Sequence, residues 1–390
     1  MSDKNIIDVI RYVKPEVERV LWARAAGRCQ FNGCNRLLYK SPITQELVNI
    51  AEKAHIYSFS ENGPRGWGVF KKKLQNINSI ENLMLMCHDC HKTIDKDKDG
   101  VKYSASLLQQ WKEKHEYRVY TVTGIADDLK SHVVFYNSNI GEQRSSFQQK
   151  EAMGAMFAQN RFPISENPIH LSMAWSNEDN SPVFWEQEAD NLHREFNRKI
   201  SPLIEENPTK HFSLFCLAPI PLLIKLGTLF TDQFPVDTYQ FIREPKGWHW
   251  QEFPNGFEFI IKTPTENKGN PALIISLSDI ITHDRVKKVM GEDVSIWELT
   301  VPQKHIHNDN IRNKKQLSMM REAVRRLTIQ IKEAHGLYIP LSIFPAISVS
   351  CSIEMGMARM PKANMPWIIY DQNNKERSFI ETITIGNVDC

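Results

Sequence analysis

The sequence has no long apolar run. Nowhere among its 390 residues do about 18 uncharged apolar residues stand in succession, although a membrane-spanning helix needs a run of roughly that length. Its start, MSDKNIIDVIRYVKPEVERV, also lacks the apolar segment of a secretory signal peptide. We therefore expect a chain that neither crosses a membrane nor is exported, and we place it in the cytoplasm.

Cysteine is scarce, and its distribution is uneven. Of seven cysteines, four lie in the first quarter of the chain, as a C-x4-C pair and a C-x2-C pair: Cys29, Cys34, Cys87 and Cys90. In a reducing compartment, clustered cysteines are better explained as metal ligands than as a disulfide framework. Two short-spaced pairs supply the four thiolates of a tetrahedral structural Zn²⁺ site. The sequence therefore predicts one structural zinc, either in a binding module without chemistry or in a catalytic domain.

Charge is almost balanced overall, but basic residues concentrate in one part of the chain. The formal net charge is +2, of which residues 1–120 carry +6 and the remainder −4. A basic segment is the better candidate for contact with a polyanion, although a solvated surface explains the same asymmetry. Within it, RGWGVFKKK mixes aromatic and basic residues, as loops that follow a phosphate backbone do. Four side chains of this stretch are candidate DNA contacts: Arg65, Lys71, Lys72 and Lys73.

The insert between the two cysteine pairs contains candidate catalytic residues. AEKAHIYSF alternates as a short strand does, and SIENLMLMCHDCHKTI joins an asparagine, an apolar run and a histidine directly after C-x2-C. The order His55, Asn82, His91 around these cysteines is that of the HNH nucleases. Residues 20–117 resemble the ββα-metal nuclease fold in its four-cysteine form. We therefore expect an α+β nuclease domain over residues 1–120.

This resemblance implies metal-dependent hydrolysis of phosphodiesters. His55 is then the general base, Asn82 orients the strand of His55, and His91 binds the catalytic Mg²⁺ or Mn²⁺, while the zinc is structural. Many such sites place an Asp or His directly before the general base as a metal ligand, but this chain has Ala54 there. Glu52 lies two residues earlier on the same strand face, and we expect it to supply the missing ligand.

The rest of the chain is organised differently. Residues 121–165 are polar and show little periodicity, so we predict a linker there. Over residues 166–390, apolar strands are interleaved with longer amphipathic segments. This alternation indicates a separate α/β domain with a largely parallel sheet.

A weak internal repeat divides this second domain. Residues 215–227 (FCLAPIPLLIKLG) and 344–356 (FPAISVSCSIEMG) share an apolar strand end, a loop and a helix that closes on glycine, 129 residues apart, and a tyrosine follows each, at Tyr239 and Tyr370. Two related Rossmann-like halves bind ligands in a crevice at the carboxyl ends of their strands. The arrangement resembles the SAVED domain, a fused pair of CARF-like halves that senses cyclic oligonucleotides.

The SAVED resemblance implies a nucleotide site in that crevice. Aromatic side chains stack on bases, while hydroxyl, amide and cationic groups bind phosphates. The predicted cyclic-nucleotide-binding residues are Trp175, Lys304, Ser348, Ser350, Arg359, Lys362 and Tyr370.

Together, the two domains resemble the HNH–SAVED endonuclease effectors of bacterial cyclic-oligonucleotide antiphage systems (CBASS). The resemblance implies that a cyclic di- or trinucleotide promotes self-association, between dimer and tetramer, and thereby releases degradation of double-stranded DNA, without a membrane partner. One alternative is a zinc-stapled, ligand-sensing DNA-binding regulator that does not hydrolyse DNA. Another is a nuclease that cuts constitutively, with site preference and without a second messenger.

Overall fold

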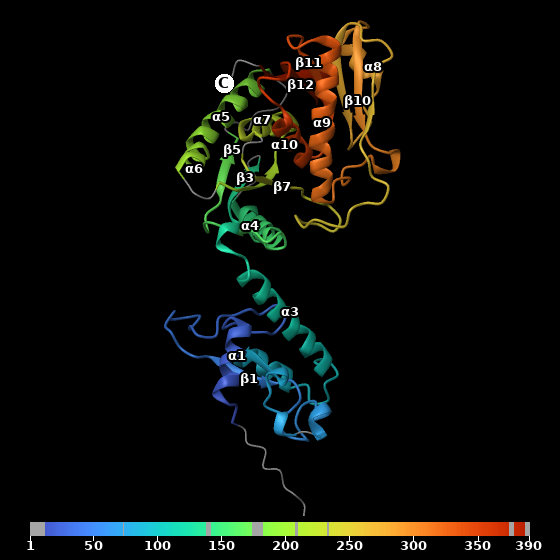
Figure 1. Ribbon diagram of the computed structural model, residues 1–390. Coiled ribbons are helices and arrows are strands. Elements are labelled where there is room, and N and C mark those ends of the chain that lie inside the picture. Colours follow the sequence, from blue (N-terminus) through green and yellow to red (C-terminus); the bar gives the residue numbers. More distant parts are fainter. Residues whose placement is uncertain are drawn as a thin grey trace, which may run out of the picture. The chain divides into compact units, whose positions relative to one another are not determined.

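The computed structural model of the protein describes residues 12–72, 74–137, 142–173, 182–206, 210–231, 234–373 and 378–386. The chain forms two compact units, Met1–Ile125 (the first unit) and Ala126–Cys390 (the second unit), each considered by itself (Figure 1). Across the described ranges, no helix is long and apolar enough to cross a bilayer.

The first unit is built on one antiparallel hairpin with a helix directly after it. Strands β1 (Ala51–His55) and β2 (Leu83–Cys87) pair in a register that places His55 opposite Leu83. Strand β2 is apolar on both faces and fully buried, which explains its uninterrupted run LMLM. Helix α2 (His88–Asp95) begins immediately after β2 and packs on both strands. The predicted ββα arrangement is confirmed.

Longer helices and short 3-10 turns surround this hairpin. Helices α1 (Pro15–Ala25) and α3 (Ala105–Thr123) pack against each other, and α1 also covers β2. Ser104 caps α3 by accepting a hydrogen bond from the backbone N–H of Leu107. The loop between the two strands holds three 3-10 helices: η1 (Gly68–Lys72), η2 (Leu74–Asn76) and η3 (Ile80–Asn82).

The first half of the second unit is a parallel sheet with β3 (Lys130–Asn137) at its centre. On one side β3 pairs with β6 (Phe212–Leu217), which pairs with β7 (Val236–Tyr239). On the other side it pairs with β4 (Phe162–Pro163) near its start and with β5 (Ile169–Ser172) near its end. The helices of this half are α4 (Glu142–Phe157), α5 (Pro182–Lys199), α6 (Ser201–Glu206) and α7 (Ile220–Phe230), and a 3-10 turn, η4 (Asp127–Leu129), precedes β3.

This arrangement differs from the predicted linker over residues 121–165. That segment contains the central strand β3 and helix α4. Residues Val133, Val134, Phe135 and Tyr136 of β3 are all buried. Because only four consecutive positions are apolar and polar residues flank them on both sides, the strand does not stand out in the sequence.

The second half has a six-stranded sheet in the order β13-β12-β11-β9-β10-β8. Its four inner strands are parallel, and the two edge strands are antiparallel to their neighbours. The strands are β8 (Ile260–Lys262), β9 (Asn270–Ser276), β10 (Val294–Thr300), β11 (Leu341–Ala346), β12 (Trp367–Asn373) and β13 (Ser378–Ile385). The helices are α8 (His283–Met290), α9 (Lys314–His335) and α10 (Val349–Ala358), with a 3-10 turn, η5 (Gln303–His305), after β10.

The two halves repeat the same topology. The strand order β5-β3-β6-β7 of the first half corresponds to β10-β9-β11-β12 of the second. Phe215 stacks on Tyr239 with ring centroids 4.3 Å apart, and Phe344 stacks on Tyr370 at 4.5 Å in the equivalent strands. These stacked pairs are the aromatic residues of the sequence repeat. The prediction of an α/β unit made of two related halves is confirmed.

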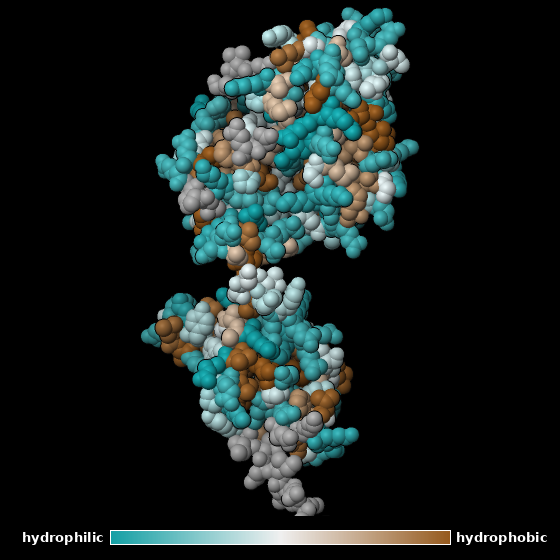
Figure 2. All heavy atoms as spheres, in the orientation of Figure 1, coloured by the Kyte–Doolittle hydropathy of each residue, from teal (hydrophilic) through white to brown (hydrophobic). Residues whose placement is uncertain are grey.

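One hydrophobic core joins the two halves. It takes side chains from the inner faces of both sheets and from α5, α7, α9 and α10. The outer faces of the two sheets bury separate, smaller clusters beneath α4 and α8. With its apolar residues placed in these clusters, the unit exposes mainly hydrophilic side chains on the face shown in Figure 2.

Helices α7 and α10 cross at two glycines. A Cβ atom added to Gly227 would lie 2.2 Å from the carbonyl oxygen of Ile353, and one added to Gly356 would lie 2.1 Å from that of Ile224. The two glycine Cα atoms face each other, so the helix backbones touch where the halves meet. These are the glycines that close the two repeats, and the contact explains why both positions lack a side chain.

Alanine at either glycine should therefore destabilise the second unit. The added methyl group meets backbone, which cannot rotate away, and overpacking of this kind costs about 1–3 kcal/mol or more. We expect Gly227→Ala and Gly356→Ala to lower the urea midpoint of the second unit. Gly154→Ala in α4 is the matched control, because its Cβ would meet only the His249 ring at an ordinary 3.5 Å. Equal midpoints for all three variants would contradict this account of the crossing.

Candidate functional site

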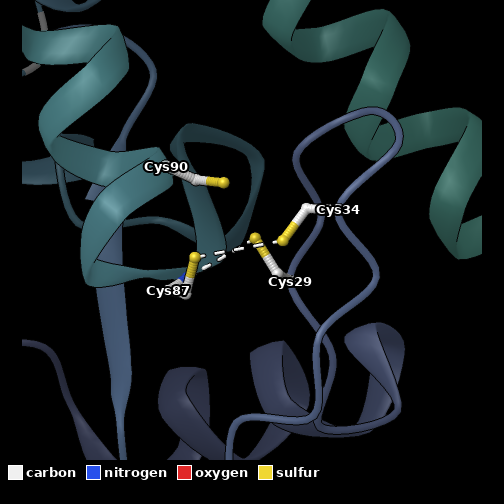
Figure 3. Close-up of side chains that lie close together, drawn as sticks. All are labelled: Cys29, Cys34, Cys87 and Cys90. Carbon is white, nitrogen blue, oxygen red and sulfur yellow. Dashed lines mark hydrogen bonds between the residues drawn. The ribbon is translucent and has the colours of Figure 1, made fainter. Parts of the chain in front are cut away.

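The four predicted zinc ligands converge in the first unit. Cys29 and Cys34 lie on one loop, Cys87 ends β2, and Cys90 lies in the first turn of α2 (Figure 3). Their sulfur atoms all lie within 4.8 Å of one another, and the Sγ atoms of Cys34 and Cys87 are 3.9 Å apart. A Zn–S bond of about 2.3 Å in a tetrahedron places neighbouring sulfurs about 3.8 Å apart. The arrangement therefore fits Zn²⁺ in size and ligand type.

The local backbone and the charge balance support the same assignment. Gly33 has φ +86°, which permits the tight turn between the first two cysteines. The backbone N–H of Cys87 donates to Cys29 Sγ, as is common around metal-bound thiolates. Burial raises the pKa of Cys29 to about 12. Four thiolates this close together repel one another unless a cation is bound, and Zn²⁺ would supply that charge.

Asn82 holds the chain just after His55. Its side chain is 1% exposed. The amide oxygen accepts from the backbone N–H of Tyr57 at 2.8 Å, and the amide nitrogen donates to the carbonyls of Tyr57 at 3.0 Å and Ile77 at 2.9 Å. The backbone carbonyl of Asn82 also accepts from Ile56. Asn82 thus fixes the end of β1, as its predicted role requires.

The imidazole of His55 is oriented by a residue that the sequence analysis did not identify. His55 Nε2 lies 2.9 Å from Asn78 Oδ1, and Asn78 Nδ2 donates to the carbonyl of Tyr12. A neutral imidazole that donates from Nε2 presents Nδ1 as its proton acceptor. Asn78 lies in a polar loop where one asparagine looks like any other, so no sequence signal distinguishes it.

His91 lies between two carboxylates. Its Nδ1 is 3.6 Å from Glu52 Oε2, and its Nε2 is 3.3 Å from Asp95 Oδ2. Glu52 Oε1 also lies 3.1 Å from His88 Nδ1. This hydrogen bond lowers the pKa of Glu52; partial burial opposes the effect, and the nearby His91 adds to it. Asp95 was missed in the sequence, although its i,i+4 spacing from His91 on a helix is a usable signal.

These groups have the chemistry of a Mg²⁺ or Mn²⁺ site. Carboxylate ligands suit both Mg²⁺ and Mn²⁺, and imidazole is a common ligand of divalent transition metals. His91 with Asp95 or Glu52 would hold the ion, although within the part of the chain that the structure describes these atoms do not close into a three-ligand cluster. Such an ion, when bound, supplies positive charge for a developing phosphorane. The assignments of His55, Asn82, His91 and Glu52 to catalysis remain predictions.

The candidate DNA contacts separate into two kinds. Lys71 and Lys72 are exposed in η1, and Lys71 is 3.2 Å from Glu61. Lys73 lies outside the described residues. Arg65 does not fit the prediction, because its side chain is only 3% exposed and its guanidinium binds backbone carbonyls. A charged residue in a loop is normally expected at the surface, but the fold buries Arg65.

Two predicted phosphate ligands of the second unit are already engaged within the fold. Ser350 is fully buried, and both its backbone N–H and its hydroxyl donate to Gln240 Oε1, which follows β7. Ser348 caps α10 by accepting from the backbone N–H of Cys351. Both serines stand at the strand-to-helix turn as expected, but their hydroxyls link the two halves and cap a helix. This arrangement does not present them to a phosphate.

Arg359 and Lys362 also differ from the prediction, for a topological reason. Helix α10 starts at the carboxyl end of β11 and runs back, so residues after it lie at the amino edge of the sheet. Arg359 is 5% exposed and donates to the carbonyl of Gly386. The neighbouring Ile385 pairs with Trp367, the first residue of β12, so this contact lies at the amino edge. Lys362 is exposed beyond it. Neither faces the carboxyl-end crevice in which they were predicted.

The other predicted ligand residues have different outcomes. Tyr370 is half-buried against Phe344 in the cluster beneath α8, so its ring already has a stacking partner. Lys304 is exposed in η5, directly after β10, with its Nζ 3.5 Å from the carbonyl of Asn255. It lies at the carboxyl edge as expected, and its contact with a nucleotide stays a prediction. Trp175 lies outside the described residues.

A cavity of about 580 Å³ lies between α5, α7 and β13. Its lining is mixed: Trp185 and Ile383 contribute apolar surface, and Asp190, His193 and Lys225 contribute polar groups. None of the predicted nucleotide-binding residues that the structure describes lines it. The cavity is therefore distinct from the crevice in which the sequence analysis placed the ligand.

Buried charges add a further link between the halves. His211 Nδ1 lies 2.8 Å from Ser131 Oγ, and His211 Nε2 lies 3.5 Å from Asp237, which also pairs with Lys314 at the start of α9. Burial lowers the pKa of His211 to about 4. Although a Ser-His-Asp series suggests a hydrolase, these three side chains are buried at the amino edge of the strands. We interpret Ser131, His211 and Asp237 as structural residues that help to hold the two halves together.

Comparisons with known proteins agree with this architecture. The family model for an HNH endonuclease (HNH_2) matches residues 29–98. The family model for SAVED, the SMODS-associated and fused to various effectors sensor domain, matches residues 192–385. The chain is an HNH–SAVED protein. No curated protein matches it.

Solved structures similar to this HNH–SAVED protein are distant in sequence. One is the Acinetobacter baumannii Cap4 SAVED/CARF-domain receptor with the cyclic trinucleotide 2'3'3'-cAAA, at 12% identity and TM-score 0.42, over 80% of this chain and 67% of that one. Another is the Moraxella osloensis Cap4 SAVED/CARF-domain receptor, at 10% identity and TM-score 0.37, over 82% and 70%. The chain thus spans about two-thirds of these receptors.

Removing zinc should unfold the first unit selectively. Its ligands join a loop to the start of α2, whereas the second unit has its own cores. We expect Cys29→Ser, or strong chelation, to reduce bound zinc from one ion per chain to none and to melt the first unit while the second unit's unfolding transition persists. Zinc is measured by inductively coupled plasma mass spectrometry. The control is Cys216→Ser in the second unit, which should retain its zinc. Zinc retained in Cys29→Ser would refute the assignment.

Proposed function

We propose that the chain is a DNA endonuclease effector of bacterial antiviral immunity, of the CBASS type, controlled by a cyclic di- or trinucleotide. The nuclease is assigned to Met1–Ile125 and the sensor to Ala126–Cys390, following the two compact units. Ligand binding favours a self-associated state, between dimer and tetramer, that cuts double-stranded DNA. The observation that carries the proposal is the pairing of an HNH endonuclease match with a SAVED match in one chain.

The chemistry rests on the residues around β1 and α2. His55 accepts a proton from the attacking water, and the contact of its Nε2 with Asn78 Oδ1 orients the imidazole for that step. Asn82 keeps the imidazole in place through its bonds to Tyr57. His91 and Asp95 present ligand atoms for a divalent cation. This division of roles leaves the four cysteines a structural function only.

Control by a cyclic oligonucleotide rests on the second unit. Its two halves repeat one topology and share a core, and α/β sheets of this kind bind ligands at strand carboxyl ends. A cyclic di- or trinucleotide has bases to stack and phosphates to neutralise, and Lys304 is an exposed cation at that edge. The ligand can activate cutting only if it binds the cutting state more tightly than the resting one.

Plasmid digestion tests regulation directly. In the presence of Mg²⁺ but without a cyclic nucleotide, the purified protein should leave supercoiled plasmid intact. It should degrade the plasmid when the matching member of a panel of cyclic di- and trinucleotides is added. Agarose gels report cutting, and light scattering reports the mass of the assembly in the same samples. Cutting that is equally fast without any nucleotide would favour a constitutive nuclease and contradict the proposed control.

Substitution of His55 tests hydrolysis. His55→Ala should reduce the cutting rate by about 10²–10⁴-fold, the usual contribution of a general base. Zinc content and nucleotide binding, measured by mass spectrometry and calorimetry, should be unchanged. His115→Ala is a control histidine, because its Nε2 bonds to the carbonyl of Ala25, away from the site. Full cutting activity in His55→Ala would contradict the general-base role of His55. DNA binding without any cutting by the native protein would instead favour the regulator without hydrolysis.

A further inference from the structure

Arg65 is a buried arginine that joins the two catalytic elements. It lies in the loop after β1, with 3% of its side chain exposed. Its Nη2 donates to the carbonyl of His55 at 3.3 Å and its Nε to that of Ile56, at the end of β1. Its Nη1 donates to the carbonyl of Ile94 at 3.0 Å, near the end of α2. A single guanidinium therefore connects the strand of the candidate base to the helix of the candidate metal ligands.

The same guanidinium reaches the metal-binding side chains through Asp95. Arg65 Nη2 lies 3.6 Å from Asp95 Oδ1, and the other carboxylate oxygen lies 3.3 Å from His91 Nε2. Thus one nitrogen contacts both the backbone of His55 and the carboxylate that neighbours His91. The charge of Arg65 also compensates that of Asp95 in this half-buried place.

The position carries two energetic costs. Arg65 has φ +64°, a left-handed conformation that a residue with a Cβ rarely adopts. Burial also disfavours its charge and lowers its pKa, with Asp95 opposing that effect. Left-handed backbone at a residue other than glycine persists where the surroundings over-determine it, often at functional sites. The three carbonyl bonds and the Asp95 contact are what over-determine it in this loop.

We infer that Arg65 is a positioning residue of the nuclease site, which sets His55 and the His91–Asp95 pair at a fixed separation. This inference rests on the proposed function and adds to it a residue that touches neither substrate nor metal. Lysine cannot replace it, because an ammonium lacks the planar fork that reaches three carbonyls on two elements. Lysine does keep the positive charge beside Asp95, so it separates geometry from charge.

Arg65→Lys is compared with the native protein in two measurements. The first is steady-state plasmid cutting at saturating Mg²⁺ and activator, in which we expect kcat to fall about 100-fold, since a misplacement of about 1 Å costs that much, while KM for DNA changes less than about threefold. The second is Mn²⁺ titration followed by electron paramagnetic resonance, which needs no cutting. We expect Mn²⁺ to bind about tenfold more weakly, as when a partner that orients metal ligands is lost.

The control is Arg118→Lys, an exposed arginine of α3 in the same unit that contacts Asn35 and His115. It should leave both measurements unchanged. Zinc content and thermal unfolding are measured for every variant. Arg65→Gln is a second substitution, because its side-chain amide is neutral but still donates hydrogen bonds.

Each outcome decides the inference. Zinc-loaded, folded Arg65→Lys with reduced kcat and weaker Mn²⁺ binding supports it. Native-like kcat overturns it, and so does loss of zinc or of folding in both Arg65 variants, because the residue would then be a general structural one. If the native protein binds Mn²⁺ but cuts no DNA under any condition, the proposed function fails, while weaker Mn²⁺ binding in Arg65→Lys still supports the positioning role.

Discussion

The convergence of four thiols on one point determines the geometry of the first unit. The sulfur atoms of Cys29 and Cys34 meet those of Cys87 and Cys90 where β2 turns into α2. A bound Zn²⁺ ties a loop to this corner, and the direction in which α2 leaves the hairpin follows from it. His91 and Asp95 lie one and five residues beyond the last cysteine. In the proposed function, a zinc ion at the four cysteines would therefore fix the position of His91 and Asp95 without taking part in the chemistry.

A second constraint, the close backbone contact between α7 and α10, determines how the two halves of the second unit pack. Because Gly227 and Gly356 let α7 and α10 touch, the inner faces of the two sheets enclose a single core. The bond from Ser350 to Gln240 and the ion pair from Lys314 to Asp237 also pass between the halves. A ligand at the strand carboxyl ends would therefore act on two halves that already form one body. Its effect on the nuclease must come from a difference in binding free energy between two states.

The sequence predicted those features whose residue types are rare or regularly spaced. The cysteine pairs, the order of His55, Asn82 and His91, and the glycines of the repeat were all recognisable for that reason. Residues with ordinary identities were missed or misplaced. Asn78 gave no distinctive signal, and Asp95 was missed although its spacing from His91 is informative. Arg65 was taken for a surface cation, and Arg359 was assigned to the wrong edge of its sheet. In each case the deciding fact was a tertiary contact or the direction of a helix, which composition and periodicity do not contain.

We propose that the first unit holds two metals with separate tasks, zinc for structure and a divalent cation beside His55 for catalysis. Anomalous scattering from crystals grown with Mn²⁺, collected on both sides of the zinc and manganese absorption edges, tests it most directly. The account predicts zinc among the four cysteine sulfurs and manganese at His91 and Asp95, next to the His55 strand. Manganese found only among the cysteines, or a metal-free His91 in crystals that contain DNA and activator, would contradict it.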